Sequence, residues 1–187
     1  MRFTDRVLQR WRIAKVRPFI PPGAVILDIG SADGSLFHSL GSALGKGSMG
    51  VDPTLPKPLT VNGCALVPGF FPEAIPPSAG QFDVITMLAV LEYFPPSAHA
   101  GLSEGCRRFL RPGGKLVITV PSPAVDWILA ALKFLRLVDG MSLEEHYGYR
   151  VEQTTEVFPA PHFKLLRRAK FQLGLNNLFV LERTLVP

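Results

Sequence analysis

The sequence has 187 residues, 47% of them hydrophobic and 19% charged, which predicts one globular domain and excludes a disordered chain. Lys and Arg outnumber Asp and Glu by 20 to 15, which leaves a net charge of +5. This charge permits an anionic partner, but the chain lacks a recognisable nucleic-acid-binding module with interleaved aromatic residues. Nucleic acid is therefore only a minor alternative as a partner.

Cysteine usage and hydropathy indicate a cytoplasmic protein with no membrane span. Cys64 and Cys106 are isolated and lack metal-ligand spacing, so we interpret them as buried free thiols and expect no metal site. The N-terminus carries arginines instead of the apolar run of a secretory signal. The longest apolar helical stretch, residues 124–138, is interrupted by charges and is shorter than the roughly 20 residues that a membrane span needs.

Helical and strand-like segments alternate along the chain. The apolar patterns predict seven strands, at residues 24–29, 48–51, 65–68, 82–88, 115–120, 163–173 and 178–184. Helices are predicted at residues 4–17, 34–44, 97–110 and 124–138. In the first helix Phe3, Val7, Trp11 and Ala14 form one apolar stripe, with arginines on the other faces.

This alternation predicts an α/β fold with a doubly wound, Rossmann-like sheet. The sheet should be mostly parallel and seven-stranded, with an antiparallel last strand and helices on both faces. We expect a single domain over residues 1–187, with an N-terminal helix at 1–20 and a lid-like insertion at 124–150. Such sheets bind ligands at the carboxyl ends of their strands, beside the switch in strand order.

The segment "DIGSADG" follows the first predicted strand and has the features of a ligand-binding turn. Gly30 permits a sharp bend and lets a ligand approach the backbone closely. The small residues Ala32 and Gly34 add little side-chain bulk to the rest of the turn. The helix beyond it offers free amide groups to an acidic ligand group. Asp28, at the strand end, is an acceptor for a bound amine or hydroxyl.

A second acid, Asp52, ends the next strand 24 positions after Asp28. This is close to the spacing of about 20 residues at which a carboxylate meets ribose hydroxyls, although a turn-forming Asp-Pro pair is the alternative. A dinucleotide is disfavoured because Ala32 replaces the second glycine of its usual motif and Asp33 would repel a pyrophosphate. S-adenosylmethionine, with an amine and a sulfonium and no phosphate, suits an acidic turn better.

The segments "VILDIGSADG", "GVD", "FDVITMLAVLEYF", "LRPGGKLVITVPSP" and "FQLGLNNLFVLER" occur in this order. With them, residues 25–183 resemble the class I S-adenosylmethionine-dependent methyltransferases. The resemblance implies a cofactor site of Asp28, Gly30, Ser31, Ala32, Gly34, Asp52, Pro53, Gly69, Phe70, Phe71, Leu88 and Ala89. The chain departs from the family pattern where an adenine-contacting acid is usual, because Gly69 and Phe70 stand there. Phe70 or Phe71 would then stack on the ring, and the short segment before the third strand suggests a lost helix.

The resemblance implies methyl transfer to a small-molecule, sugar-linked or lipid-linked acceptor. His146 is the candidate general base, with an exposed loop histidine as the alternative, and Tyr93 is a candidate that more readily shapes the pocket. The N-terminal helix and the segment 124–138 are expected to cover the acceptor side or to join two copies in a homodimer. A non-catalytic methyltransferase-like binding module and a nicotinamide oxidoreductase remain as alternative functions.

Overall fold

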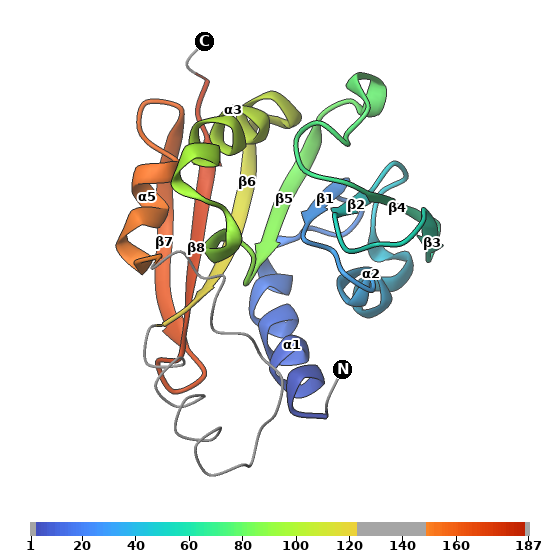
Figure 1. Ribbon diagram of the computed structural model, residues 1–187, viewed down its shortest axis with the longest axis horizontal. Coiled ribbons are helices and arrows are strands. Elements are labelled where there is room, and N and C mark those ends of the chain that lie inside the picture. Colours follow the sequence, from blue (N-terminus) through green and yellow to red (C-terminus); the bar gives the residue numbers. More distant parts are fainter. Residues whose placement is uncertain (1–2, 123–148, 186–187) are drawn as a thin grey trace.

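The computed structural model describes residues 3–122 and 149–185, which form a sheet with helices on both faces (Figure 1). The strands are β1 (Ile26–Ile29), β2 (Met49–Asp52), β3 (Leu59–Val61), β4 (Cys64–Pro68), β5 (Phe82–Leu88), β6 (Leu110–Pro121), β7 (Phe163–Phe171) and β8 (Asn176–Arg183). The α-helices are α1 (Phe3–Val16), α2 (Ser35–Leu40), α3 (His99–Phe109) and α5 (Thr154–Val157). A 3-10 turn, η4 (Leu91–Tyr93), follows β5.

The strand order is β3-β4-β2-β1-β5-β6-β8-β7, and it confirms the doubly wound α/β class. Strands β4, β2, β1, β5 and β6 run parallel, whereas β8 is antiparallel to both β6 and β7. The chain leaves β1 for β2 on one side and later returns to place β5 on the other side. The switch in strand order therefore lies at the carboxyl end of β1, where ligands are expected.

The sheet has eight strands in the described residues, one more than the sequence predicts. The additional strand is β3, which forms an antiparallel hairpin with β4 through the pairs Thr60–Ala65 and Val61–Cys64. Its turn is Asn62-Gly63, and both residues have positive φ, 50° and 80°, as a two-residue hairpin turn of this kind requires. This hairpin occupies the short segment in which the sequence predicts the loss of a helix.

Two predicted helices are shorter in the structure, and one lies outside the described residues. The predicted helix 34–44 is α2 for only six residues, followed by the 3-10 turn Gly41–Ala43. Helix α3 begins and ends within the predicted range 97–110, and the chain enters β6 directly after it. The predicted helix 124–138, and all but the last two residues of the predicted insertion 124–150, lie outside the described residues.

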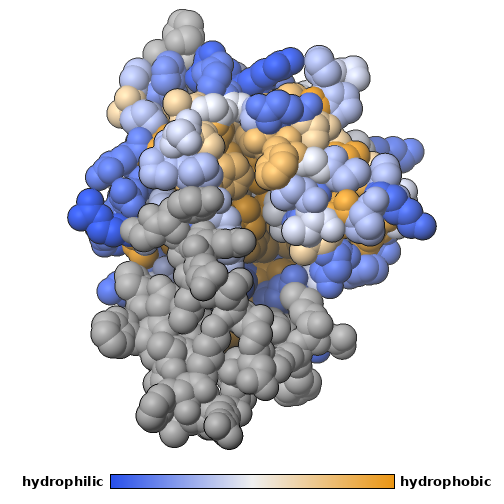
Figure 2. Space-filling model, viewed as in Figure 1, coloured by the Kyte–Doolittle hydropathy of each residue, from blue (hydrophilic) through white to orange (hydrophobic). Residues whose placement is uncertain are grey.

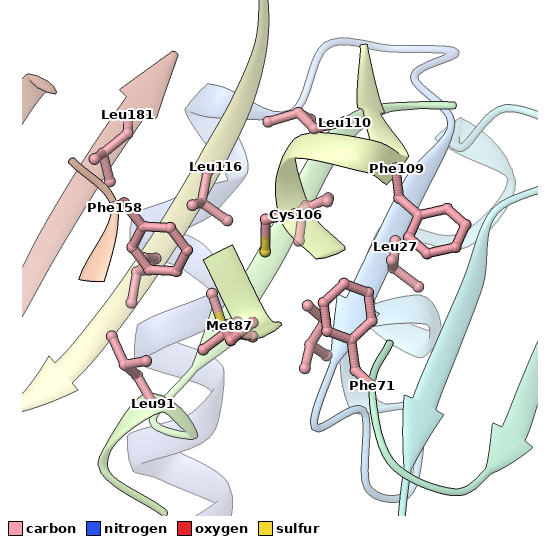
Figure 3. Close-up of a cluster of buried hydrophobic side chains, with 14 of the residues drawn as sticks. Leu27, Phe71, Met87, Leu91, Cys106, Phe109, Leu110, Leu116, Phe158 and Leu181 are labelled. Atoms are coloured by element: carbon pink, nitrogen blue, oxygen red, sulfur yellow. The ribbon is translucent and has the colours of Figure 1, made fainter. Parts of the chain in front are cut away.

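The central strands are buried because hydrophobic layers cover both faces of the sheet. On one face Cys106 and Phe109 of α3 pack with Phe71 on the sheet residues Leu27 and Met87 (Figure 3). Both cysteines of the chain are buried free thiols, as predicted.

On the opposite face α1 contributes Ile13 and Val16, and α2 contributes Phe37. All four residues of β1 and all four of β2 are buried, as expected of parallel strands in a covered sheet. Among the helices in the described part of the chain, none is long and apolar enough to span a bilayer.

Candidate functional site

The turn after β1 is held against the tip of β2 by its backbone. The amides of Gly30 and Ser31 both donate to the carbonyl of Val51, at 2.8 Å and 3.2 Å. Gly30 has φ of 77°, and a Cβ atom built there would lie 2.2 Å from Cγ2 of Val90. Ala32 also adopts a positive φ, 44°, which an alanine tolerates at a modest energetic cost. The glycine at position 30 therefore serves both the bend and the close approach of the segment after β5.

A matched pair of substitutions tests this role of Gly30. Gly63 has nearly the same φ, 80°, but faces open space. Both Gly30→Ala and Gly63→Ala introduce left-handed strain, and only the first also forces Val90 to move. We expect Gly30→Ala to lower the free energy of unfolding by about 1–3 kcal/mol more than Gly63→Ala, as overpacking does. Urea denaturation measures both values, and equal losses would contradict the close packing of Val90 on the turn.

Asp52, at the end of β2, binds the turn after β1. Its Oδ2 accepts a hydrogen bond from the backbone amide of Ala32 at 2.8 Å. Its Oδ1 accepts from the amide and the hydroxyl of Thr54, at 2.8 Å and 2.5 Å. These three bonds leave about one of the four acceptor positions of a carboxylate for a ligand. Asp52 thus fixes the turn and retains capacity for one ligand hydroxyl.

Asp28, near the end of β1, is an acid buried beneath the same turn. Its side chain is 4% exposed, and its Oδ1 accepts a hydrogen bond from the hydroxyl of Thr86 at 2.6 Å. Burial raises the pKa of Asp28 to about 7; the Thr86 hydroxyl opposes this shift, and the nearby charge of Asp52 adds to it. A positively charged ligand group beside Asp28 would favour its ionised form.

The two acids open into one cleft at the carboxyl ends of the strands. This cleft has a volume of about 650 Å³, which is in the usual range for small-molecule sites of about 300–1,000 Å³. Figure 2 shows hydrophobic residues gathered in a hollow near the centre of the side of the molecule that it draws. Of the residues predicted to bind the cofactor, the cleft is lined by Asp28, Gly30, Ser31, Ala32, Asp52, Pro53, Phe70, Leu88 and Ala89. Gly34 is not among the lining residues and instead precedes α2 as its N-cap.

A second cavity of about 460 Å³ continues from the first past Phe70 and Tyr93, which line both. Gly69 and Phe71 line this second cavity. Phe70 is 72% exposed, whereas Phe71 is buried with its ring centroid 6.0 Å from that of Phe109. Of the two phenylalanines that the sequence offers for stacking, the structure leaves only Phe70 with an exposed ring.

Helix α1 forms one wall of the cleft, a feature that the motifs did not reveal. Leu8, Gln9, Arg12 and Ile13 line it. The helix is tied to the first residue of β8, because Nε of Arg12 donates to Oδ1 of Asn176 at 3.4 Å. Arg12 therefore adds a positive charge to a cleft that also contains two carboxylates. The sequence alone does not distinguish Arg12 from the other basic residues of this helix, because the docking of the helix selects it.

Of the two candidate catalytic residues, Tyr93 lies within the described part of the chain and His146 does not. Tyr93, in η4, is 45% exposed and stands where the two cavities meet. His146 lies outside the described residues.

Val90 and Thr54 also line the cleft, although the sequence analysis did not name them as site residues. Their sequence neighbours could have indicated them, since Thr54 follows the Asp-Pro pair and Val90 follows Leu88 and Ala89.

Comparison with known proteins agrees with this geometry. The model of a family described as a methyltransferase domain matches residues 2–172, so the chain belongs to that family. The resemblance to S-adenosylmethionine-dependent methyltransferases is thereby confirmed, and the chain is an enzyme of this class with S-adenosylmethionine as its cofactor. No curated protein matches the sequence.

Three solved structures with the same fold have low sequence identity to this chain. Magnesium protoporphyrin IX methyltransferase from Synechocystis PCC 6803, solved with bound SAH, has a TM-score of 0.60 and 17% identity over 97% of this chain and 82% of its own. The N-methyltransferase NodS from Bradyrhizobium japonicum WM9 has a TM-score of 0.68 and 15% identity over 96% of this chain and 98% of its own. For the mitomycin 7-O-methyltransferase MmcR the values are 0.65 and 18%, over 93% of this chain and 53% of that one. At these identities the likeness establishes the fold.

Proposed function

We propose that this enzyme transfers a methyl group from S-adenosylmethionine to a small-molecule, sugar-linked or lipid-linked acceptor that enters beside α1. The observation that carries the proposal is the convergence of Asp28 and Asp52 on one cleft, at the switch in strand order. Two carboxylates beside a turn of small residues complement the cationic amino acid part and the ribose of S-adenosylmethionine.

The residues present fit such a cofactor, with one adjustment at the adenine. Asp28 and the turn from Gly30 to Ala32 would hold the methionine part, and the remaining acceptor position of Asp52 would take one ribose hydroxyl. The adenine-contacting acid is absent, so the exposed ring of Phe70 would supply stacking in its place. The adjoining second cavity, which Phe70 also lines, offers space for that ring.

The reaction asks the protein mainly for placement. The bound cofactor supplies an electrophilic methyl group on its sulfonium. The walls of the cleft then have to orient an acceptor nucleophile in line with that methyl and exclude water, and such positioning accounts for much of the acceleration. Tyr93, at the junction of the cavities, is placed to shape the acceptor side, and His146 remains the proposed base for an acceptor that must lose a proton.

The acceptor side is formed by α1, whose Arg12 brings a cation into the cleft. A negatively charged or hydrogen-bond-accepting group on the acceptor would meet this guanidinium. Leu8 and Ile13 on the same helix supply an apolar wall. The acceptor that this wall favours therefore combines an apolar body with an anionic or polar group.

Methyl transfer is tested with the purified protein and S-adenosylmethionine labelled on the methyl group, incubated with separate polar and lipid extracts. We expect label in an extracted component, and we expect calorimetry to detect binding of the cofactor at a concentration of about 1 mM. The variant Asp52→Asn should weaken both signals, because it removes the carboxylate at the end of β2 that lines the cleft. Cofactor binding without transfer to any extract would instead support a non-catalytic binding module.

A further inference from the structure

Helix α1 exposes an apolar stripe on the side away from the sheet. The sequence predicts a stripe of Phe3, Val7, Trp11 and Ala14, but the residues of α1 that pack into the core are Ile13 and Val16. Val7 is 44% exposed, Trp11 is 52% exposed, and Ala14 is also exposed. At 100° per residue these three side chains lie along one line of the helix, roughly opposite the buried face. Trp11 is therefore not a member of either hydrophobic core cluster.

The turn between β7 and β8 extends this apolar surface. Nε2 of Gln172 donates to the carbonyl of Leu8 at 3.1 Å, which fixes the turn beside α1. Leu173, at the turn, is 97% exposed. Figure 1 shows α1 and this turn at the same end of the molecule, near the N-terminus. We call the surface of Val7, Leu8, Trp11 and Leu173 the apolar rim, and because Leu8 also lines the cleft, the rim borders the cleft.

Cationic residues flank the apolar rim. Six of the twenty basic residues of the chain lie within its first seventeen positions, together with a single acid, Asp5. Arg10 and Lys15 flank the stripe on its two sides at helical spacing, and Lys170 lies on β7 just before the turn. The rim is therefore an apolar strip within a cationic border.

An apolar strip with cationic neighbours favours some classes of binding partner over others. A second copy of the chain docked through the same surface would bring two cationic borders together, and such like-charge contacts are unfavourable. Nucleic acid would match the cations but would leave Trp11 and Leu173 without apolar partners. An anionic bilayer matches both features, because tryptophan and leucine enter the interface while Lys and Arg side chains reach the lipid headgroups.

We propose that the apolar rim docks the enzyme on an anionic lipid surface, with the cleft opening beside that surface. This inference rests on the proposed function and narrows it, because an acceptor beside the docked cleft would be a lipid or a lipid-linked molecule. The apolar body and polar group that the α1 wall favours agree with such an acceptor. Docking through α1 would also place Arg12 near the headgroup region.

Docking is tested by sedimenting the full chain with vesicles of phosphatidylcholine alone or mixed with phosphatidylserine. We expect binding that requires phosphatidylserine and weakens with added salt. Trp127 is the only other tryptophan in the sequence, so a Trp127→Phe background lets fluorescence report on Trp11. We expect the Trp11 emission to shift to shorter wavelength on binding.

The double variant Trp11→Ser/Leu173→Ser should bind these vesicles at least about tenfold more weakly, since it removes two apolar anchors. Leu166→Ser is the matched control, because Leu166 is 45% exposed on β7 but outside the apolar rim, and it should bind as the unaltered protein does. Equal losses in both variants, or no vesicle binding, would overturn docking. Docking would also be overturned if Trp11 were needed for dimerisation or for oligonucleotide binding and the protein did not bind vesicles.

Calorimetry with S-adenosylmethionine on the same samples separates the two proposals. The docking variants alter residues that do not line the cleft, so they should bind the cofactor as the unaltered protein does. Cofactor binding without vesicle binding would overturn docking alone. Vesicle binding without cofactor binding or methyl transfer would overturn the proposed function and leave the docking surface in place.

Discussion

Asp52→Asn is expected to weaken binding of S-adenosylmethionine on the order of 10- to 100-fold, the range for loss of a charged hydrogen-bond acceptor. The substitution removes the charge that would attract a ribose hydroxyl. It also affects the turn after β1, because an amide group in place of the carboxylate turns an N–H group toward one of the donors that Asp52 accepts from, Ala32 or Thr54. Calorimetric titration measures the affinity, and thermal unfolding measures any loss of stability.

Asp33→Asn is the matched control, since it makes the same charge change within the same turn. The Asp33 side chain is exposed, accepts hydrogen bonds only from Ser35 in the described structure, and does not line the cleft. We expect its affinity for the cofactor to stay within about twofold of the unaltered protein, as for most surface substitutions. Equal losses in the two variants would mean that net charge, and not the position of Asp52, governs binding.

The position of the two acids was predictable because it follows from local patterns and one rule of topology. A continuous apolar run predicts β1, and the carboxyl ends of neighbouring parallel strands meet at one edge of a sheet. Asp28 and Asp52 therefore had to lie close together once their strands were recognised. The hairpin of β3 and β4 was also predictable, since Asn62-Gly63 is a strong turn signal. The prolines that precede β3 instead suggested a segment without regular structure.

The orientation of α1 was not predictable from its sequence, because the helix has two apolar stripes. One contains Val7 and Trp11, and the other contains Ile13 and Val16. The first stripe is the longer one, since it also includes Phe3 and Ala14, yet the sheet receives the second. The choice depends on the shape of the sheet face and on the contact of Arg12 with Asn176, which is 164 residues away in sequence.

A similar long-range contact separates the two phenylalanines at the adenine position. Phe71 is buried because α3 presents Gly105 to it, where a Cβ atom would lie only 2.7 Å from the ring. Phe70 has no such partner in α3 and keeps its ring exposed. Adjacent identical residues thus acquire different roles through Gly105, more than thirty positions downstream, a relation that no local pattern contains.

Asp28→Asn is expected to stabilise the protein without ligand at pH 8. With its pKa raised to about 7 in the folded state and near 3.8 in the unfolded chain, Asp28 keeps its proton in the folded state across the interval between these values. The folded state binds more protons there, so the free energy of unfolding falls as pH rises from about 4 to about 7 and is level above that. At 1.36 kcal/mol per pKa unit, the full effect is on the order of 2–4 kcal/mol.

Urea denaturation of the unaltered protein and of Asp28→Asn between pH 4.5 and pH 8 measures this effect. The two curves should converge toward low pH and separate toward high pH, with the variant more stable. Thr86→Val gives a second check, because it removes the hydrogen bond that lowers the Asp28 pKa. In that variant the decline in stability should continue to higher pH. Parallel curves for all three proteins would contradict a buried titrating carboxyl group at this position.

Binding of the cofactor should respond to the same group in the opposite direction. A cationic amino group beside Asp28 favours its ionised form, so the affinity of the unaltered protein for S-adenosylmethionine should rise up to about tenfold from pH 6 to pH 8. Asp28→Asn should bind more weakly at pH 8 and lack this rise. A residue that destabilises the empty protein but strengthens the complex is the pattern expected of a binding group, because stability and function often oppose each other at such sites. An Asp28→Asn protein that gained stability and kept full affinity would show that the ligand does not contact this acid.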